Sequence, residues 1–290
     1  MWNRNVETFL CCDAEPEAAS TALFGAPYDS TTSFRPGARF GPGTIRRESW
    51  GLESYSPYQD ADLLDCRIAD LGDLELPFGD PAPALEAIEA QAAALLDAGV
   101  RPFLLGGEHL VTLGAVRAAA ARHPALCIVH FDAHADLRDA YLGASLSHAC
   151  VLRRCWELLG DGRIFQFGIR SGDREEFRWG AAHVATRRFD FQGLEETVEA
   201  LAGRPVYVTV DLDVLDPSVF PGTGTPEPGG VAFDALRRAV TLVCSRCRVV
   251  ACDVNELSPH YDASGSSTAA ACKIVREMLL ALEAPAAGTP

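Results

Sequence analysis

Short apolar runs alternate with amphipathic stretches along almost the whole chain. The apolar runs, many of them rich in β-branched residues, predict strands at 22–25, 67–70, 102–105, 126–131, 164–168, 206–210 and 249–254. The stretches with helical spacing predict helices at 44–49, 84–97, 111–123, 147–159, 194–202, 233–244 and 267–282. Strands and helices that alternate in this way form a parallel sheet covered by helices on both faces. The pattern therefore predicts an α/β fold whose ligands bind at the carboxyl ends of the strands.

The alternating pattern is not divided by a linker, so we expect a single domain over residues 1–290. The Pro/Gly-rich segment 221–230 is followed directly by another helix and strand, which makes it a loop inside the fold. A short extension over about 1–20 and a tail over about 284–290 are expected at the two ends.

The composition is that of a globular protein with a strong excess of acidic residues. The chain has 40 Asp and Glu against 25 Lys and Arg, and its formal net charge is −15. Such a charge repels phosphates, so no nucleic-acid partner is expected. It attracts small cations, which favours a cationic small-molecule substrate.

The sequence also bears on location. No window reaches the ~18 consecutive apolar residues of a membrane span, and the N-terminus lacks the pattern of a secretory signal. We therefore expect a cytoplasmic protein without a membrane partner. The ten cysteines are interpreted as reduced, mostly buried thiols. This includes the CxxC pair Cys244 and Cys247, because no second pair follows at zinc-finger distance.

Polar side chains that can bind a metal follow three of the predicted strands. Asp132, His134 and Asp136 alternate at the end of the apolar run 126–131. In extended backbone, alternate side chains point to one side, so these three can converge on one point. Taken alone, such a spacing is a weak signal, since a lone acidic pair is often a solvated turn or a helix cap.

The same arrangement recurs at two other strand ends. Asp211 and Asp213 follow the run 206–210, and His109 follows 102–105 after two glycines that allow close backbone approach. Carboxylates at the ends of apolar strands are costly to bury unless a cation neutralises them. The whole set exceeds the ligands that one tetrahedral ion needs, so the sequence predicts two ions bridged by carboxylates. Oxygen-rich ligands without thiolate favour Mn²⁺ over zinc, and Fe²⁺, Co²⁺ and Ni²⁺ stay open.

Longer segments around these residues resemble the metal-binding signatures of the ureohydrolases, the family of arginases and agmatinases. The similar segments are 106–109, 132–136, 211–217, 25–29, 34–42, 222–230 and 253–259. The resemblance runs from about Phe24 to the end of the last predicted helix. It implies a three-layer α/β/α arginase-like fold with an eight-stranded parallel sheet, assembled as a trimer or hexamer.

The resemblance further implies two Mn²⁺ ions per subunit. One ion would be held by His109, Asp132, Asp136 and Asp211, and the other by Asp132, His134, Asp211 and Asp213. A water shared by the two ions would lose a proton near neutral pH. The resulting hydroxide would attack the guanidinium carbon of the substrate, and the products would be urea and an amine.

Three residues match catalytic positions of the family. Asp136 can accept a hydrogen bond that orients the hydroxide, and Glu256 matches the carboxylate that binds the guanidinium group. His148 matches the histidine that carries a proton to the leaving amine. The alternative for His148 is an N-terminal helix residue without chemistry.

The tail of the substrate is indicated by fewer residues. Where the arginase pattern has Asn, two residues after the third ligand of the HxD cluster, this chain has Arg138 and resembles the agmatinase pattern instead. Agmatine is therefore the expected substrate. Arg138 could also bind a carboxylate, which keeps 4-guanidinobutyrate and 3-guanidinopropionate open, as well as arginine. Asp173, Glu175 and Glu176 could face the far amine of agmatine through water, but the favoured interpretation is that they are surface residues of a helix.

Other functions and residues carry less weight. A deacetylase-like hydrolase on this fold would lack His109 and the second carboxylate pair, and a non-catalytic homologue would have lost a ligand or His148. Arg170 is assigned equally to the site and to a structural ion pair. The remaining histidines match no role and are left out of the predicted site: His123, His130, His183 and His260.

Overall fold

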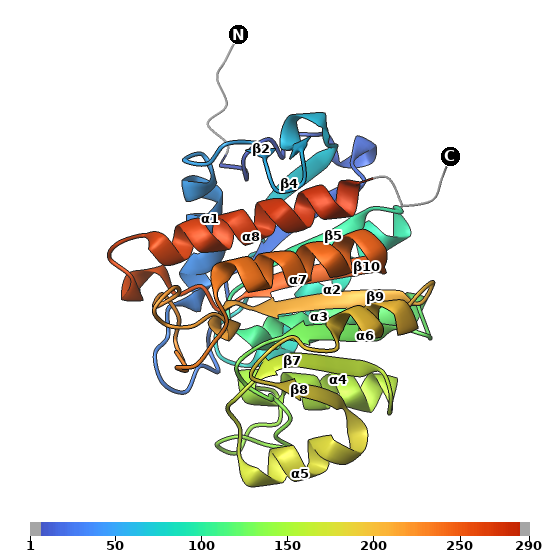
Figure 1. Ribbon diagram of the computed structural model, residues 1–290, viewed down its shortest axis with the longest axis vertical. Coiled ribbons are helices and arrows are strands. Elements are labelled where there is room, and N and C mark those ends of the chain that lie inside the picture. The colour runs from blue at the N-terminus through green and yellow to red at the C-terminus, as the bar shows by residue number, and fades with distance from the viewer. Residues whose placement is uncertain (1–6, 285–290) are drawn as a thin grey trace.

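The computed structural model describes residues 7–284, in which eight strands form one parallel sheet (Figure 1). The strands are β1 (Thr21–Ala26), β4 (Ile68–Asp73), β5 (Arg101–Gly106), β6 (Cys127–Phe131), β7 (Ile164–Ile169), β8 (Ala185–Arg188), β9 (Pro205–Asp211) and β10 (Arg248–Asn255). Their order across the sheet is β4-β1-β5-β10-β9-β6-β7-β8. A separate antiparallel pair consists of β2 (Tyr55–Ser56) and β3 (Ala61–Asp62).

Helices cover both faces of the sheet (Figure 1). The helices are α1 (Gly41–Ser49), α2 (Pro81–Asp97), α3 (Thr112–Arg122), α4 (Val151–Leu159), α5 (Arg174–His183), α6 (Leu194–Ala200), α7 (Phe233–Arg246) and α8 (Ser266–Glu283). Buried side chains of α1, α6, α7 and α8 belong to one core cluster, and those of α2, α3 and α4 to a second cluster on the other face. The three-layer fold with an eight-stranded parallel sheet is confirmed.

All seven strands predicted from the hydrophobic pattern are present, whereas β8, α5 and the short pair of β2 and β3 were missed. β8 is a short edge strand, and its side chains are mostly exposed, so no apolar run marks it. α5 buries only Glu176 and Gly180, so it has no apolar stripe. It begins instead with a capping box between Asp173 and Glu176. The helix expected from residue 147 begins at Val151, after a 3-10 turn over His148–Cys150.

The register of the central strands brings their carboxyl ends to one level. Val254 of β10 pairs with Leu105 of β5, and Asn255 pairs with Asp211 of β9. Val210 of β9 pairs in turn with Phe131 of β6. The residues that follow β5, β6, β9 and β10 therefore meet at one edge of the sheet, where the sequence predicted the site.

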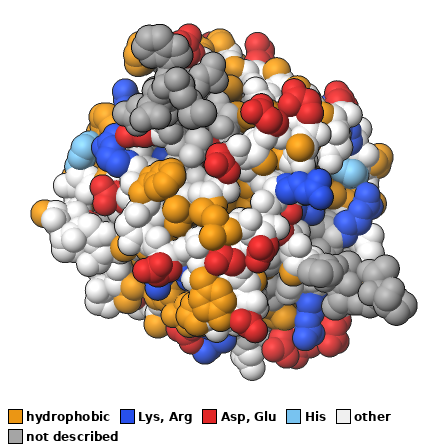
Figure 2. Space-filling model, turned by 90° about the horizontal axis from the view of Figure 1, so that it is seen from above, with side chains coloured by type: hydrophobic (Ala, Val, Ile, Leu, Met, Phe, Trp, Pro, Cys, Tyr) orange, Lys and Arg blue, Asp and Glu red, His pale blue; other side chains and the backbone are white. Residues whose placement is uncertain are grey.

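The periphery of the fold agrees with the acidic composition. On the face in Figure 2, acidic side chains lie among hydrophobic and neutral ones, and basic side chains are scattered.

Within the predicted N-terminal extension, Phe9 and Cys12 are buried against the core, while residues 1–6 lie outside the described part of the chain. Of the predicted tail, 285–290 also lie outside it. No helix within residues 7–284 is long and apolar enough to cross a membrane.

Candidate active site

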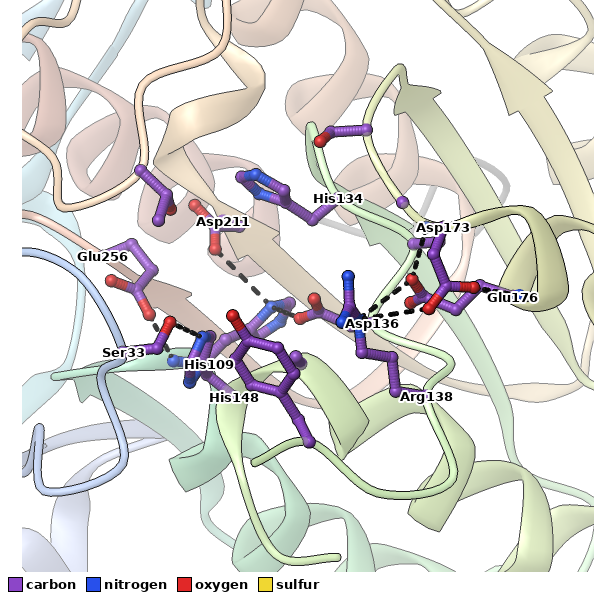
Figure 3. Close-up of a pocket in the computed structure, with 16 residues that line it drawn as sticks. Ser33, His109, His134, Asp136, Arg138, His148, Asp173, Glu176, Asp211 and Glu256 are labelled. Atoms are coloured by element: carbon purple, nitrogen blue, oxygen red, sulfur yellow. Dashed lines mark hydrogen bonds and ion pairs between the residues drawn. The ribbon is translucent and has the colours of Figure 1, made fainter. Parts of the chain in front are cut away.

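A pocket of about 250 Å³ opens at the carboxyl edge of the sheet (Figure 3). Its lining includes seven of the predicted site residues: His109, His134, Asp136, Arg138, His148, Asp211 and Glu256. Asp132 and Asp213 do not line the pocket but contact the two histidines from below its surface. The volume is small for a ligand pocket, which suits a small substrate.

His109 lies at the centre of one group of carboxylates. Its Nδ1 is 3.0 Å from Asp136 Oδ2, 3.1 Å from Asp132 Oδ2 and 3.6 Å from Asp211 Oδ2. His134 lies at a second group, with its Nδ1 3.0 Å from Asp213 Oδ2 and 3.5 Å from Asp132 Oδ1. Asp132 thus turns one oxygen toward each histidine, as a bridging ligand would.

The donor set fits two divalent cations. The four aspartates of these groups are buried, with 6% exposure or less, and within residues 7–284 no lysine or arginine forms an ion pair with any of them. There are two groups of potential ligands, and within each group the ligand atoms lie within 4.8 Å of one another. The groups are His109-His130-Asp132 and Asp132-His134-Asp213, which share Asp132. So many buried carboxylates without a basic partner need a cation. The chemistry of these side chains therefore matches a binuclear centre with oxygen-rich ligation.

The pKa values of the cluster reflect the burial of its carboxylates and the repulsion between them. Burial and the charge of Asp132 raise the pKa of Asp136 to about 7. Burial, Asp213 and Asp132 raise the pKa of Asp211 well above its usual range. Burial lowers the pKa of His109, but hydrogen bonds to Asp132 and Asp136 outweigh this and raise it. Without metal, the cluster holds protons in place of cations.

Two of the site residues have an unusual backbone conformation. Asp136 has φ of 52° and Glu256 has φ of 67°, in the left-handed region that non-glycine residues rarely adopt. Such a conformation costs about 1–3 kcal/mol and persists only where the surroundings fix it. One such contact is the hydrogen bond of 2.7 Å from the His109 backbone N–H to Glu256 Oε1. It joins the guanidinium-binding candidate directly to a metal-ligand candidate.

The glycines after β5 allow neighbouring parts of the protein to pack closely against the backbone. A Cβ on Gly106 would lie 1.7 Å from Asn255 Oδ1, and one on Gly107 would lie 2.0 Å from the carbonyl oxygen of Tyr28. These glycines let the segment before His109 pack between β10 and the loop after β1. The backbone at these glycines therefore packs against other protein atoms, and this packing sets the position of His109.

His130 was left out of the predicted site, and the structure places it against Asp132. Its Nε2 lies 2.8 Å from Asp132 Oδ2, and Gln166 Nε2 donates to its Nδ1 over 3.1 Å. Burial lowers the pKa of His130, so the ring is neutral and its Nε2–H donates to the carboxylate. His130 therefore holds Asp132 through Oδ2, the same oxygen that faces His109. Alternation along β6 puts both side chains on one side, but only the fold shows that Gln166 of β7 sets the tautomer.

A second supporting group lies beneath His109. His109 Nε2 is 2.9 Å from Thr209 Oγ1, and this hydroxyl donates to Asp253 Oδ1 over 2.6 Å. Asn255 and Tyr207 also donate to Asp253. Because the hydroxyl proton of Thr209 points to Asp253, Thr209 accepts from His109 Nε2–H. Nδ1 of His109 is left as the atom that faces the carboxylates.

His148 lies on the other side of the pocket, at the start of the 3-10 turn that leads into α4. Its Nε2 is 3.5 Å from Ser33 Oγ. Burial and the charge of His134 lower the pKa of His148 to about 4. The ring is therefore neutral near pH 7.

The outer end of the pocket contains acidic and basic side chains. Arg138 Nε donates to Glu176 Oε2 over 3.1 Å, and its guanidinium group lies 4.5 Å from the centre of the Tyr141 ring. Glu176 is buried and Asp173 lines the pocket beside it. The interpretation of Glu176 as a surface residue is therefore wrong, because α5 turns it inward. Glu175 is exposed and pairs with Arg178, as expected for the helix surface.

Arg170 has a structural role in the described contacts. It donates to the carbonyl oxygens of Asp213 over 2.8 Å, Val214 over 3.1 Å and Glu227 over 2.7 Å. These bonds hold the loop after β9 in place. All ten cysteines are free, and seven of them are buried, Cys244 of the CxxC pair among them.

Comparisons with known proteins agree with this geometry. Residues 19–281 match the model of the arginase family. The chain is 45% identical over 279 residues to an agmatinase of Bacillus subtilis (strain 168), over 94% of this chain and 96% of the relative. It is 35% identical to a guanidinobutyrase of Pseudomonas aeruginosa, over 93% of this chain and 88% of that relative. The solved structure of the agmatine ureohydrolase of Thermoplasma volcanium matches with a TM-score of 0.89 and 36% identity, over 97% of this chain and 95% of that chain.

Proposed function

We propose that this chain, which belongs to the arginase family and is a ureohydrolase, hydrolyses agmatine to urea and putrescine with two bound Mn²⁺ ions. The observation that carries the proposal is the double cluster of buried carboxylates around His109 and His134, in a pocket whose outer end is acidic. The similarity to agmatinases supports the choice of substrate.

The metal ligands of the proposal are the six residues whose side chains form the double cluster: His109, Asp132, His134, Asp136, Asp211 and Asp213. When bound, two divalent ions would supply a water of lowered pKa that reacts as a nucleophile near neutral pH. Asp136 lines the pocket and would orient that nucleophile by accepting a hydrogen bond.

Two further residues would act on the substrate itself. Glu256, held by the His109 backbone, would pair with the planar guanidinium group by charge-assisted hydrogen bonds. This pairing fixes the orientation of the guanidinium carbon toward Asp136. His148 would take up at Nε2 the proton that the attacking hydroxyl group gives up and pass it to the leaving nitrogen, so that the carbon–nitrogen bond breaks and neutral amine and urea separate.

The acidic end of the pocket supports a cationic tail. Asp173 and Glu176 carry two negative charges there, and Arg138 supplies one positive charge that is already paired with Glu176. The net charge of these three groups, −1, favours the ammonium group of agmatine. A guanidino acid is the second candidate, because Arg138 is next to the pocket and could turn from Glu176 to a substrate carboxylate.

We expect Mn²⁺-loaded protein to release urea from agmatine ~100-fold more efficiently than from arginine, 4-guanidinobutyrate or 3-guanidinopropionate, about 2.7 kcal/mol in kcat/KM. The measurement is urea release with each substrate. A guanidino acid in the lead would contradict the agmatine assignment and leave the hydrolytic chemistry in place. No urea from any of the four would contradict the proposed function as a whole.

Glu176→Gln tests the tail assignment directly. It removes one negative charge and releases Arg138, so kcat/KM for agmatine is expected to fall about tenfold while that for 4-guanidinobutyrate rises. Glu175→Gln, the same change at the exposed neighbouring position, is the matched control and should leave both values unchanged. Equal effects of Glu176→Gln on the two substrates would mean that the carboxylate does not discriminate between their tails.

The cellular setting is also part of the proposal. Ten free cysteines fit a reducing compartment, and we propose the cytoplasm. We further propose a homo-oligomer, a trimer or hexamer as in the family, which light scattering of the purified protein would test.

A further inference from the structure

Glu108 is a buried carboxylate that the proposed reaction does not use. It precedes His109, its exposure is 0%, and within residues 7–284 no ion pair neutralises it. Within residues 7–284, all hydrogen bonds to its side-chain carboxylate come from one loop. Oε2 accepts from the Thr31 backbone N–H over 2.9 Å and from Thr32 Oγ1 over 3.1 Å, and Oε1 accepts from Thr31 Oγ1.

Thr31 connects this carboxylate to His148. The Thr31 Oγ1 atom accepts from the His148 backbone N–H over 3.1 Å and lies 3.5 Å from His148 Nδ1. A hydroxyl group has one proton, and here that proton points to Glu108. Thr31 Oγ1 therefore faces His148 only as an acceptor. This favours the tautomer with the proton on Nδ1, and leaves the lone pair on Nε2.

The Nε2 atom is the one placed for chemistry. It lies on the Ser33 side of the ring, and both residues line the pocket beside Glu256 (Figure 3). A ring in the other tautomer would present an N–H there and could not take up a proton at Nε2. The orientation and the proton position of His148 thus depend on Thr31, and those of the Thr31 hydroxyl depend on Glu108.

We propose that Glu108 is a positioning residue that acts through Thr31 to hold His148 in the tautomer with a free Nε2. The inference rests on the proposed function, because it assigns His148 the proton transfer to the leaving amine. It goes beyond that function by giving the loop 29–33 a part in catalysis. The competing view is that Glu108 only anchors this loop to the end of β5.

Two substitutions and one control separate these views. Thr31→Val keeps the shape of the side chain but removes the acceptor, whereas Thr31→Ser keeps the hydroxyl group and is the matched control. Glu108→Gln makes a sharper prediction. The Thr31 backbone N–H can only donate, so the amide oxygen must take the place of Oε2 and the NH₂ group must face Thr31 Oγ1. The hydroxyl proton of Thr31 then turns to His148 Nδ1, which reverses the tautomer.

The tautomer can be read without turnover, by magic-angle-spinning NMR of ¹⁵N-histidine-labelled, Zn²⁺-loaded protein, with His148→Gln identifying the signals. We expect a protonated Nδ1 in the wild type and in Thr31→Ser, a mixture in Thr31→Val, and an unprotonated Nδ1 in Glu108→Gln. An unchanged His148 signal in both Thr31→Val and Glu108→Gln would overturn the proposal. If Thr31→Val does not fold, Glu108→Gln alone decides.

Kinetics on the Mn²⁺-loaded protein provide the second readout. Thr31→Val and Glu108→Gln should lower kcat about 10- to 100-fold, with KM for agmatine within about twofold and the metal content unchanged, and Thr31→Ser should stay near the wild type. Equal losses in Thr31→Ser and Thr31→Val would support mere anchoring of the loop and overturn the proposal. If the wild type releases no urea, the proposed function fails, and the NMR result still decides whether Glu108 sets the tautomer.

Discussion

Asp211→Ala is expected to abolish both metal binding and turnover. Asp211 lies at the end of β9, its Oδ2 faces His109 over 3.6 Å, and its Oδ1 accepts from the Asp213 backbone N–H over 2.8 Å. In the proposed centre Asp211 would help to hold both ions, so its loss would affect two sites at once. We expect kcat/KM to fall by a factor on the order of 10³ or more, about 4 kcal/mol. Metal analysis after dialysis should find neither ion at full occupancy.

Asp211→Asn and Asp216→Asn make this test specific. The amide of Asp211→Asn still accepts from the Asp213 backbone, so the local turn stays while the bridging charge is lost, and the defect should persist. Asp216 belongs to the same motif but accepts from Ser218, Gly229 and Gly230 outside the pocket. Asp216→Asn gives up some of these loop contacts but changes none of the four aspartates of the cluster, so it should bind both ions and lose far less activity than Asp211→Asn. Full metal content in Asp211→Asn would contradict the bridging role.

The sequence was sufficient to predict that the candidate ligands at the strand ends lie close together. Asp132, Asp211 and His109 each follow an apolar strand, and in a parallel sheet such ends meet at one edge. That inference needs only the alternation along one strand and the level register of its neighbours, such as Asn255 opposite Asp211. The hydrophobic pattern therefore located the candidate metal cluster before any contact was known.

The parts that were missed depend on contacts between elements. His130 is one of several histidines in the chain, and nothing next to it in sequence shows that Gln166 fixes its ring. Glu176 lies on a helix without an apolar stripe, so the pattern did not indicate that it turns toward Arg138. Both residues support other side chains of the site. Such roles are set by the distance between elements, which periodicity along the chain does not contain.

The metal-free protein is expected to be less stable at pH 8 than at pH 5.5. Burial raises the pKa of Asp136 to about 7, whereas the carboxyl ionises near 4 in the unfolded chain. Between these values the folded state binds more protons than the unfolded state, so the free energy of unfolding falls as the pH rises. His109, whose pKa is raised well above its usual value, has the same sign, because above about pH 6.5 the folded state keeps a proton that the unfolded state has lost. The pKa of Asp132 is lowered, so its contribution is complete by pH 5 and does not change over this range.

Bound Mn²⁺ should reverse this dependence, because metal binds the deprotonated ligands and stabilises the folded state more at pH 8. Between pH 5.5 and pH 8, Asp136 alone accounts for up to about 2 kcal/mol of the change in the free energy of unfolding, because only the interval from pH 5.5 to its pKa of about 7 contributes. This is an upper limit, because the surroundings relax as it ionises. Thermal unfolding of chelator-treated protein, with and without Mn²⁺ at the two pH values, measures both effects. Asp136→Asn should remove much of the pH dependence, whereas Asp139→Asn, at the exposed carboxylate that pairs with Arg154, should not. Metal-free protein that is more stable at pH 8 would show that the cluster does not hold protons in place of cations.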